Sequence, residues 1–407
     1  MKKYALVGAS SRCFAMFAKP LVEEYSDIAK VVGVFDTNRG RSEYYNKHLG
    51  IPIFDDFDAM MKETKPDNVI VTTVDGFHHE YIIRALDYGC DAISEKPLTT
   101  DAVKCNAILE AQKRTGKKVT VTFNARYGPY SAKVKELLMS GAIGDILSVN
   151  KEYFLDTSHG ADYFRRWHGK LENSGGLLVH KSTHHFDKIN WWVNDEPDTI
   201  YANGSLDFYG PKRENRGERC STCKFAHSCE FYADFHKREF HKEFYFDNEK
   251  YDGYHRDGCV FSDKIDIYDN MSLAVKYKKG ILLTYSLTAF NPIEGWKAVI
   301  YGTKGRLEAQ EHGSGIPALD PYNRAVNTIK VYDMKNELAV HHVPTRQGGH
   351  GGSDELLQSH LFRGVTHDPL GQAASLRDGV NSLMIGVCAN MSIKDGKPHR
   401  VSDYVKM

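Results

Sequence analysis

Apolar and polar residues follow two different rhythms along the chain. In the first 123 residues, short continuous apolar runs alternate with longer segments whose apolar residues have helical spacing. We expect strands at the following runs: Tyr4–Gly8, Val31–Asp36, Asn68–Thr73, Asp91–Ser94 and Lys118–Phe123. The segments with helical spacing are 14–25, 56–64, 79–88 and 101–115. Because continuous apolar strands are buried on both faces, this alternation predicts an α/β fold with a doubly wound parallel sheet.

The later strands have a different pattern, in which apolar residues alternate with polar ones. Each such strand has one buried and one exposed face, which predicts an open sheet. The expected strands are Leu147–Tyr153, Ser272–Tyr277, Ile281–Ser286, Lys297–Gly302 and Thr328–Asp333. A helix is expected at about residues 371–392, and residues 205–262 interrupt the rhythm as an insertion.

The composition excludes several classes of protein. The chain has 407 residues, with 53 Lys plus Arg and 53 Asp plus Glu, so its formal net charge is zero. This balance argues against a nucleic-acid binder, and 41% hydrophobic residues are too many for a disordered chain. No apolar run reaches the roughly 18 residues of a membrane span, and the N-terminal apolar stretch is too short for a signal peptide. We therefore expect no membrane partner and a cytoplasmic location.

The turn after the first strand is a candidate phosphate-binding loop. A dinucleotide fingerprint has the form Gly-x-Gly-x-x-Gly, and here only Gly8 is kept, with Ser10 and Cys13 in the other two places. Ser10, Ser11 and Arg12 offer donors to a pyrophosphate at the start of the next helix. An ordinary strand-to-helix turn explains the same residues equally well.

The end of the second strand bears on the cofactor. Asp36 is an acid at the position that binds ribose hydroxyls and repels a 2′-phosphate, which favours NAD. Three basic residues nearby, Arg12, Arg39 and Arg41, can reverse this preference. NAD is therefore the expected cofactor, and NADP stays open.

The strongest local motif follows the third and fourth strands. Thr73 and His78 lie after the third strand, and Glu95-Lys96-Pro97 ends the fourth. A lysine at this edge of the sheet can hydrogen-bond a substrate hydroxyl and share its proton. The alternative is a structural salt bridge between Glu95 and Lys96 that closes the sheet.

With these motifs the chain resembles the Gfo/Idh/MocA family of sugar and polyol oxidoreductases. The family pattern has a His after strand three, Glu-Lys-Pro at strand four, and further landmarks downstream. The matching segments here are His78, Glu95–Pro97, Asn124–Pro129 and Ser140–Gly144. These matches occur in the family's order and spacing, and the resemblance covers nearly the whole chain.

The resemblance implies a fold, an assembly and a cofactor site. It implies a Rossmann domain at residues 1–123, then an α+β domain at 124–407 with a large open, mostly antiparallel sheet and a Cys-rich insertion at about 205–262. It also implies a homodimer or homotetramer through that sheet, and Lys96 as a catalytic residue. The expected cofactor-binding residues are Gly8, Ser10, Ser11, Arg12, Asp36, Thr73, His78, Glu95, Lys96, Asn124 and Arg126.

A glycine-rich segment in the second domain is expected to carry the rest of the site. Relatives have an Asp and, four residues later, a catalytic His; here these positions are His180 and His184. In the family one turn of helix separates these two positions. His184 is expected to be the base, with Lys96 sharing or relaying the proton, and His180 is a further catalytic candidate because a histidine in place of the aspartate can donate as well as accept. Two core histidines, or a histidine pair that ligates a metal, are the alternatives.

Two further segments are candidates for substrate binding. Aromatic and basic residues concentrate just before the glycines, and a glycine-rich turn near the C-terminus precedes a helix. The candidates are Arg166, Trp167, Lys181, His350 and Asp354. An ordinary aromatic core with exposed arginines explains the first segment equally well.

Four cysteines of the insertion are spaced as metal ligands. Cys220, Cys223 and Cys229 form Cys-x2-Cys-x5-Cys, and Cys259 follows. Four thiolates in an ordered loop predict a structural zinc, with an iron–sulfur cluster as the less favoured metal centre. Free cysteines are the alternative, and nearby histidines can replace one ligand: His227, His236 and His241.

The sequence thus leads to three functional hypotheses. The first is an NAD(P)-dependent dehydrogenase that acts on a secondary hydroxyl of a sugar, sugar derivative or cyclitol. The second keeps the site but retains the cofactor, and cleaves a glycoside by transient oxidation and elimination. The third is a nucleotide-binding regulator without catalysis, against which Lys96 and His184 argue.

Overall fold

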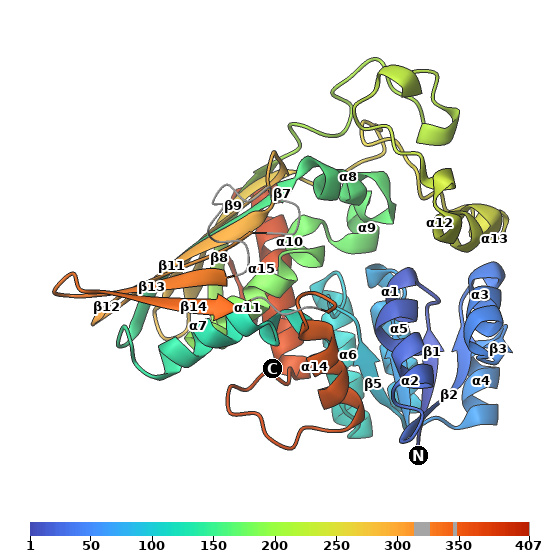
Figure 1. Ribbon diagram of the computed structural model, residues 1–407, viewed down its shortest axis with the longest axis horizontal. Coiled ribbons are helices and arrows are strands. Elements are labelled where there is room, and N and C mark those ends of the chain that lie inside the picture. Colours follow the sequence, from blue (N-terminus) through green and yellow to red (C-terminus); the bar gives the residue numbers. More distant parts are fainter. Residues whose placement is uncertain (313–325, 345–347, 407) are drawn as a thin grey trace.

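The computed structural model describes residues 1–312, 326–344 and 348–406, which are organised around two sheets (Figure 1). The N-terminal sheet and its helices occupy one side of the molecule, and a larger sheet extends away on the other. The insertion lies above both, with its short helices over the N-terminal part. The α/β fold class predicted from the sequence is confirmed.

Within the described residues, the first sheet has six parallel strands in the order β3-β2-β1-β4-β5-β6. Their bounds are β1 Lys2–Val7, β2 Ala29–Phe35, β3 Ile53–Phe54, β4 Asn68–Val71, β5 Asp91–Ser94 and β6 Val119–Val121. The strand order reverses between β1 and β4. In such sheets, the crevice at the carboxyl ends of the strands beside this reversal is where a ligand binds.

Helices cover both faces of this sheet. They are α1 Ser11–Cys13, which continues through a π-helical segment Phe14–Ala18 into α2 Lys19–Glu23, then α3 Arg39–Leu49, α4 Phe57–Thr64, α5 His78–Asp87 and α6 Ala102–Thr115. The sequence pattern missed α3, because Tyr44, Tyr45 and Leu49 are its only strongly apolar residues. It also missed β3, which has only two residues.

The second sheet has nine strands in the described parts of the chain, in the order β14-β13-β12-β11-β7-β10-β9-β8-β15. Neighbouring strands are antiparallel except for β7 and β10. Their bounds are β7 Ile146–Asp156, β8 Pro197–Ser205, β9 Asn270–Tyr277, β10 Leu282–Asn291, β11 Gly295–Gly302, β12 Gly305–His312, β13 Val326–Asp333, β14 Leu338–Pro344 and β15 His399–Arg400. Buried and exposed residues alternate along β9, as the sequence predicts for a sheet with one open face.

The remaining helices pack on this sheet, lie where the two parts of the molecule meet, or belong to the insertion. Their bounds are α7 Pro129–Met139, α8 Thr157–Arg165, α9 Leu171–Ser174, α10 Leu177–His180, α11 Thr183–Val193, α12 Glu239–Phe244, α13 Glu249–Asp252, α14 Ser353–Phe362 and α15 Leu376–Asp395. In the described parts of the chain, no helix combines the length and the apolar character needed to cross a membrane.

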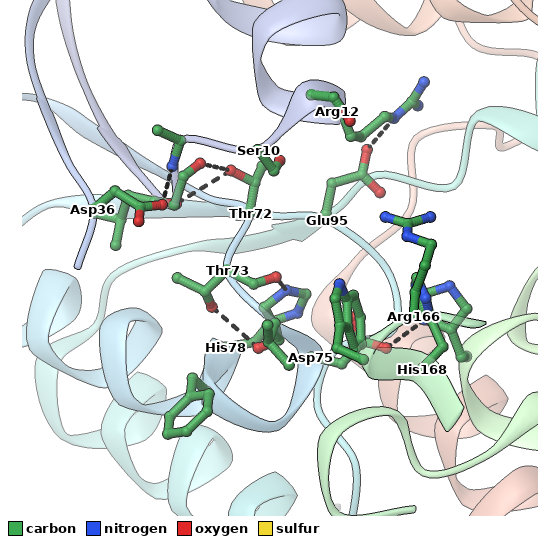
Figure 2. A pocket seen from close by; sticks show the side chains of 18 of the residues that line it. Ser10, Arg12, Asp36, Thr72, Thr73, Asp75, His78, Glu95, Arg166 and His168 are labelled. Carbon is green, nitrogen blue, oxygen red and sulfur yellow. Dashed lines mark hydrogen bonds and ion pairs between the residues drawn. The ribbon is translucent and has the colours of Figure 1, made fainter. Parts of the chain in front are cut away.

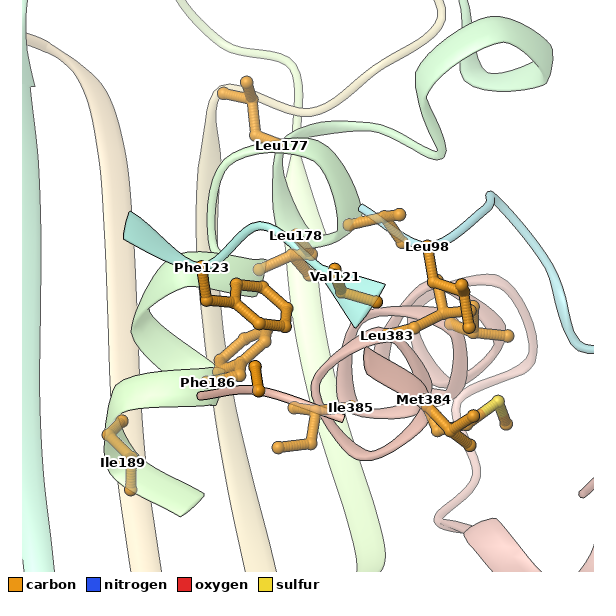
Figure 3. Close-up of a cluster of buried hydrophobic side chains, with 14 of the residues drawn as sticks. Leu98, Val121, Phe123, Leu177, Leu178, Phe186, Ile189, Leu383, Met384 and Ile385 are labelled. Atoms are coloured by element: carbon orange, nitrogen blue, oxygen red, sulfur yellow. The ribbon is translucent and has the colours of Figure 1, made fainter. Parts of the chain in front are cut away.

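One continuous hydrophobic core joins the two sheets (Figure 3). Val121 from β6, Phe186 from α11 and Leu383 from α15 are almost completely buried in it. Burying a side chain of this size contributes about 1.5–3 kcal/mol. Because α15 packs against α10, α11 and the edge of the first sheet, the two parts hold a defined position on either side of the crevice.

The insertion between β8 and β9 is held by buried charges and aromatic rings. Arg219 forms ion pairs with Glu249 and Asp257, and the Asp257 side chain is 2% exposed. Phe231 packs edge-on against Phe261. These contacts order a long segment that has no strand of its own within the described residues.

Candidate active site

A cavity of about 810 Å³ lies at the carboxyl ends of β1, β2, β4 and β5 and is closed from the other side by α8, α10 and α11. Its volume is within the range of about 300–1,000 Å³ that is typical of ligand sites. Figure 2 shows Asp36 and Ser10 at one end, and Asp75, Arg166 and His168 grouped apart from them. We call these the ribose end and the reaction end.

At the ribose end, the backbone turns sharply after β1. Gly8 has φ +87°, and a Cβ there would lie 2.6 Å from the carbonyl carbon of Thr72. Glycine therefore lets β1 and β4 approach closely at the point where the chain turns. The Ser10 hydroxyl accepts a hydrogen bond from the Cys13 backbone N–H and caps the following helix.

Asp36 is positioned by the backbone around it. Its carboxylate accepts hydrogen bonds from the backbone N–H groups of Ala9 and Asn38, both at 2.6 Å. Arg41 also donates to it, at 3.1 Å. The acid thus lies at the end of β2, where the sequence predicts a ribose-binding carboxylate.

Asp354 organises three of the residues that line the cavity. Its carboxylate accepts hydrogen bonds from Arg12 at 3.1 Å, from Asn124 at 2.7 Å and from His350 at 2.8 Å. Arg12 also donates to Glu95, at 2.9 Å. Asp354 is not among the lining residues, so it acts as a positioning group and not as a direct contact. Burial acts to raise the pKa of Asp354, but the hydrogen bond from His350 and the positive charge of Arg12 hold it well below its ordinary value.

His78 links the ends of two strands. Its Nδ1 lies 2.8 Å from the Pro97 carbonyl oxygen, and its Nε2 lies 3.1 Å from the Thr73 carbonyl oxygen. Burial lowers its pKa. Both ring nitrogens therefore face the protein, and His78 holds the Lys96–Pro97 loop in place.

Arg126 lies outside the cavity, in contrast to its predicted place among the cofactor-binding residues. Its guanidinium is 2% exposed and donates to Asp187 and Asp378. Two carboxylates on other helices satisfy this donor, so it is turned into the core. The sequence motif could not reveal these partners, because they are remote along the chain.

The reaction end joins the two halves of the protein. The Lys96 ammonium donates a hydrogen bond to the His180 carbonyl oxygen at 2.9 Å. His180 Nδ1 lies within hydrogen-bond distance of Asp75 Oδ2, at 2.5 Å, and both side chains are largely buried. Glu95 pairs with Arg12 and not with the Lys96 ammonium, so the alternative of a Glu95–Lys96 salt bridge is not observed.

Burial shifts the pKa values of these groups toward one another. It raises the pKa of Asp75 well above its ordinary value, although the nearby Lys96 ammonium acts in the opposite direction. It lowers the pKa of His180 well below 6.5, and it lowers the pKa of Lys96. Shifts of this kind, caused by burial beside charged neighbours, are typical of sites that carry out acid–base chemistry.

His184 is a second imidazole at the reaction end. Burial lowers its pKa well below 6.5, and its Nδ1 has no hydrogen-bond partner among the described residues. The sequence places His180 and His184 on one helix, but the structure divides them between α10 and α11, with a break at Lys181 and Ser182. Both histidines nevertheless line the same cavity.

Three of the predicted substrate residues, Arg166, Trp167 and Lys181, also lie at this end. Arg166 donates to Asp162 at 2.9 Å, and Trp167 stacks on the ring of His168. The Lys181 ammonium lies 5.6 Å from the ring centre of Tyr153 and 5.8 Å from that of Tyr163. Burial lowers its pKa to about 8. Flat rings beside donors form a surface that suits a polyhydroxylated ring.

Most predicted site residues therefore meet in one cavity. The lining includes Gly8, Ser10, Ser11, Arg12, Asp36, Thr73, His78, Glu95, Lys96, Asn124, Arg166, Trp167, His180, Lys181, His184 and His350. Sequence reasoning missed Asp75, Tyr245, Asp252 and Tyr254, which also line it. The only available signal for Asp75 was an acid just after a buried strand, and the residues of the insertion carried none.

The four cysteines of the insertion are not arranged as a metal centre. Cys220, Cys223, Cys229 and Cys259 are free thiols that line one small cavity of about 20 Å³. Among the residues that the structure describes, no group of three or more His, Cys, Asp and Glu side chains can hold a metal ion. The Cys220 sulfur instead accepts a hydrogen bond from Arg165 at 2.9 Å. The predicted zinc site, and with it the iron–sulfur alternative, is not supported: the four thiols border one small cavity, but among the described residues they do not form a group that can hold a metal ion.

The residues present fit a nicotinamide dinucleotide. The cavity is elongated between an acid at the ribose end and a lysine–histidine group at the reaction end. At the reaction end, the buried Nδ1 of His184 has no partner in the described part of the chain, and a bound ligand can supply one.

Comparison with protein families gives two matches that together cover nearly the whole chain. Residues 2–123 match a model described as an oxidoreductase family with an NAD-binding Rossmann fold. Residues 135–401 match the C-terminal alpha/beta domain of the same oxidoreductase family.

Individual proteins agree with these matches. The YteT protein of Bacillus subtilis (strain 168) is 38% identical over 100% of this chain and 99% of its own length. The scyllo-inositol 2-dehydrogenase (NAD(+)) of the same organism is 28% identical over 44% of this chain and 50% of its own. The WlbA dehydrogenase of Bordetella pertussis, solved with NADH and UDP-GlcNAcA, has a similar fold, with a TM-score of 0.66 at 17% identity over 98% of each chain.

Proposed function

The chain belongs to the Gfo/Idh/MocA family and is an NAD(P)-dependent oxidoreductase, and on this premise we propose its substrate class and mechanism. The protein transfers a hydride between NAD and a secondary hydroxyl or keto group of a sugar, sugar derivative or cyclitol. One observation carries this proposal. Lys96 of the nucleotide-binding half and the histidines of the second half meet in a single cavity, with the Lys96 ammonium 2.9 Å from the His180 carbonyl oxygen.

In the oxidation direction, a neutral imidazole of His184 or His180 accepts the proton of the substrate hydroxyl. Burial keeps both rings uncharged near neutral pH, so each has a basic nitrogen. The bound dinucleotide supplies the acceptor for the hydride. Lys96 donates to the oxygen of the reacting carbon and shares the proton, helped by a pKa that burial has lowered.

Asp75 gives His180 its orientation. In the proposed mechanism Nδ1 carries the proton of this hydrogen bond, which leaves the lone pair of the neutral ring on Nε2. The aspartate that relatives carry on the second domain is replaced here by His180, and an acid from the first domain partners that histidine. Asp75 and His180, which we call the dyad, thus restore a carboxyl group to the reaction end.

Substrate contacts and assembly extend the proposal. Trp167 and Lys181 provide an aromatic face and a cation for a carbohydrate ring, and His350 lines the same cavity. The chain forms a homodimer or homotetramer through its open sheet, where Leu147, Tyr201 and Leu282 are exposed. Light scattering that gives a monomer mass at micromolar concentration would contradict this assembly.

Glycoside cleavage with a retained cofactor is a second candidate. It is favoured by the way Tyr245, Asp252 and Tyr254 of the insertion enclose one side of the cavity. In that reaction, oxidation of a hydroxyl acidifies the neighbouring C–H, a base removes this proton, and the glycosidic substituent leaves. Addition of water and return of the hydride then complete the cycle without net redox change.

A screen of sugars, glycosides and cyclitols with NAD and NADP distinguishes these functions. Absorbance at 340 nm and product mass are recorded together. Formation of NADH with a product two hydrogens lighter supports the dehydrogenase. Glycoside cleavage without a net absorbance change supports the second candidate. Cofactor binding without turnover of any class would contradict both and favour a nucleotide-binding regulator.

A further inference from the structure

The insertion reaches the ribose end of the cavity. We call residues 239–254, which include α12 and α13, the insertion cover; Figure 1 shows it over α1 and α3. The Tyr245 hydroxyl donates to Ser11 Oγ at 2.8 Å, and the Asn38 amide donates to the Asn248 carbonyl oxygen at 3.0 Å. The cover is therefore bonded to the turns after both β1 and β2.

The fit between the cover and α3 is close. A Cβ on Gly40 would lie 1.9 Å from Asn248 Oδ1, so only glycine allows this approach. Asn38 is 1% exposed beneath the cover. This packing gives α13 a defined position beside the start of α3, where Arg41 lies.

Arg41 is shared by two carboxylates from different parts of the chain. Its Nη2 lies 3.1 Å from Asp36 and 2.7 Å from Asp252 of the cover. Its side chain is only 15% exposed, and the two carboxylates hold its pKa above the ordinary value despite burial. The three groups together carry a net charge of −1.

This arrangement bears on the choice between NAD and NADP. An arginine beside the ribose-binding acid is the group that would accommodate a 2′-phosphate. Here Arg41 is held by Asp252, and a phosphate with nearly two negative charges would meet two carboxylates. The ribose diol of NAD needs only hydrogen-bond acceptors, which Asp36 supplies.

We propose that Asp252 makes the ribose end selective for NAD, by holding Arg41 against Asp36 and by adding a second negative charge. The inference rests on the proposed function, because it takes the Asp36 end of the cavity as the ribose site. It assigns a role in cofactor specificity to an insertion that the sequence connected only with a metal.

The test is a binding titration that needs no substrate. Fluorescence measures the Kd of NADH and of NADPH for the wild type and for Asp252→Asn. Glu230→Gln is the matched control. Like Asp252, Glu230 is an acid of the insertion that pairs with an arginine, here Arg213, but it lies outside the cavity. We expect the wild type to bind NADH more tightly. Asp252→Asn should lower the NADPH-to-NADH ratio of Kd values by about tenfold or more, as loss of a unit charge near a phosphate predicts.

The double variant Arg41→Met/Asp252→Asn tests whether the gain in NADPH binding depends on Arg41. Loss of that gain supports the inference. It is overturned if the wild type prefers NADPH, if Asp252→Asn changes the ratio by less than threefold, or if the double variant keeps the full gain. Asp252→Ser replaces Asp252→Asn if the latter does not fold. The Kd ratio is measured without turnover, so these outcomes do not test hydride transfer. The substrate screen tests hydride transfer separately.

Discussion

Replacing Asp75 by asparagine is the sharpest test of the reaction end. The substitution keeps the size of the side chain and removes its charge. Asp75 and His180 are bonded at 2.5 Å, with side chains that are 4% and 11% exposed. Little solvent is available to compensate for the lost charge, and an amide N–H₂ turned toward Nδ1 would favour the wrong tautomer of His180.

The expected loss follows from this contact. A hydrogen bond to a charged group contributes about 1.5–3 kcal/mol, and each 1.36 kcal/mol corresponds to tenfold in rate. If the bond acts fully in the transition state, kcat/KM falls by about 10- to 150-fold. The acid limb of the pH profile moves to lower pH, because the imidazolium loses the carboxylate that stabilises it.

The assay is steady-state turnover of a substrate from the screen, from pH 5 to 9, with NADH binding as a check on folding. Asp395→Asn is a matched control: Asp395 accepts a hydrogen bond from His399 at 3.1 Å, on a part of the chain that does not line the cavity. It should leave kcat/KM and the pH profile unchanged. If Asp75→Asn keeps kcat/KM within threefold of the wild type with an unmoved acid limb, the dyad has no role in proton transfer.

Three further predictions concern the same machinery and the core below it. Lys96→Met and His184→Ala should each lower kcat/KM by about 10²–10⁴. If both variants keep turnover within threefold of the wild type, the dehydrogenase and the glycoside-cleavage mechanisms are both excluded. Because burial lowers the pKa of His180 and His184, kcat/KM should fall only below about pH 6.5. The free energy of unfolding should fall in the same pH range, since the unfolded chain then binds more protons than the folded one. An acid limb of kcat/KM above pH 7 would contradict this assignment. Arg126→Met should lower the free energy of unfolding in urea by about 3–5 kcal/mol, because it leaves the buried carboxylate of Asp187 without its cation, whereas the surface variant Arg114→Met should not move the urea midpoint.

Local patterns in the sequence were sufficient for the fold class and for part of the site. The period of apolar residues depends on which faces of a strand are buried, so it distinguishes the parallel sheet from the open one. The carboxyl ends of parallel strands meet at one edge, so Asp36 and Lys96 could be assigned to the same edge of the sheet from the sequence alone. The family resemblance assigned His184 to the same site, as the counterpart of a catalytic histidine.

The partners of these residues were decided only by the tertiary structure. Asp75 and His180 are 105 residues apart, and Asp252 reaches Arg41 from an insertion whose pattern pointed to metal binding. Arg126 belongs to a family motif, yet its side chain points into the core, where it pairs with two carboxylates. A buried charge takes its partner from whatever groups the packing of distant elements brings within about 3 Å, and no local pattern records that choice.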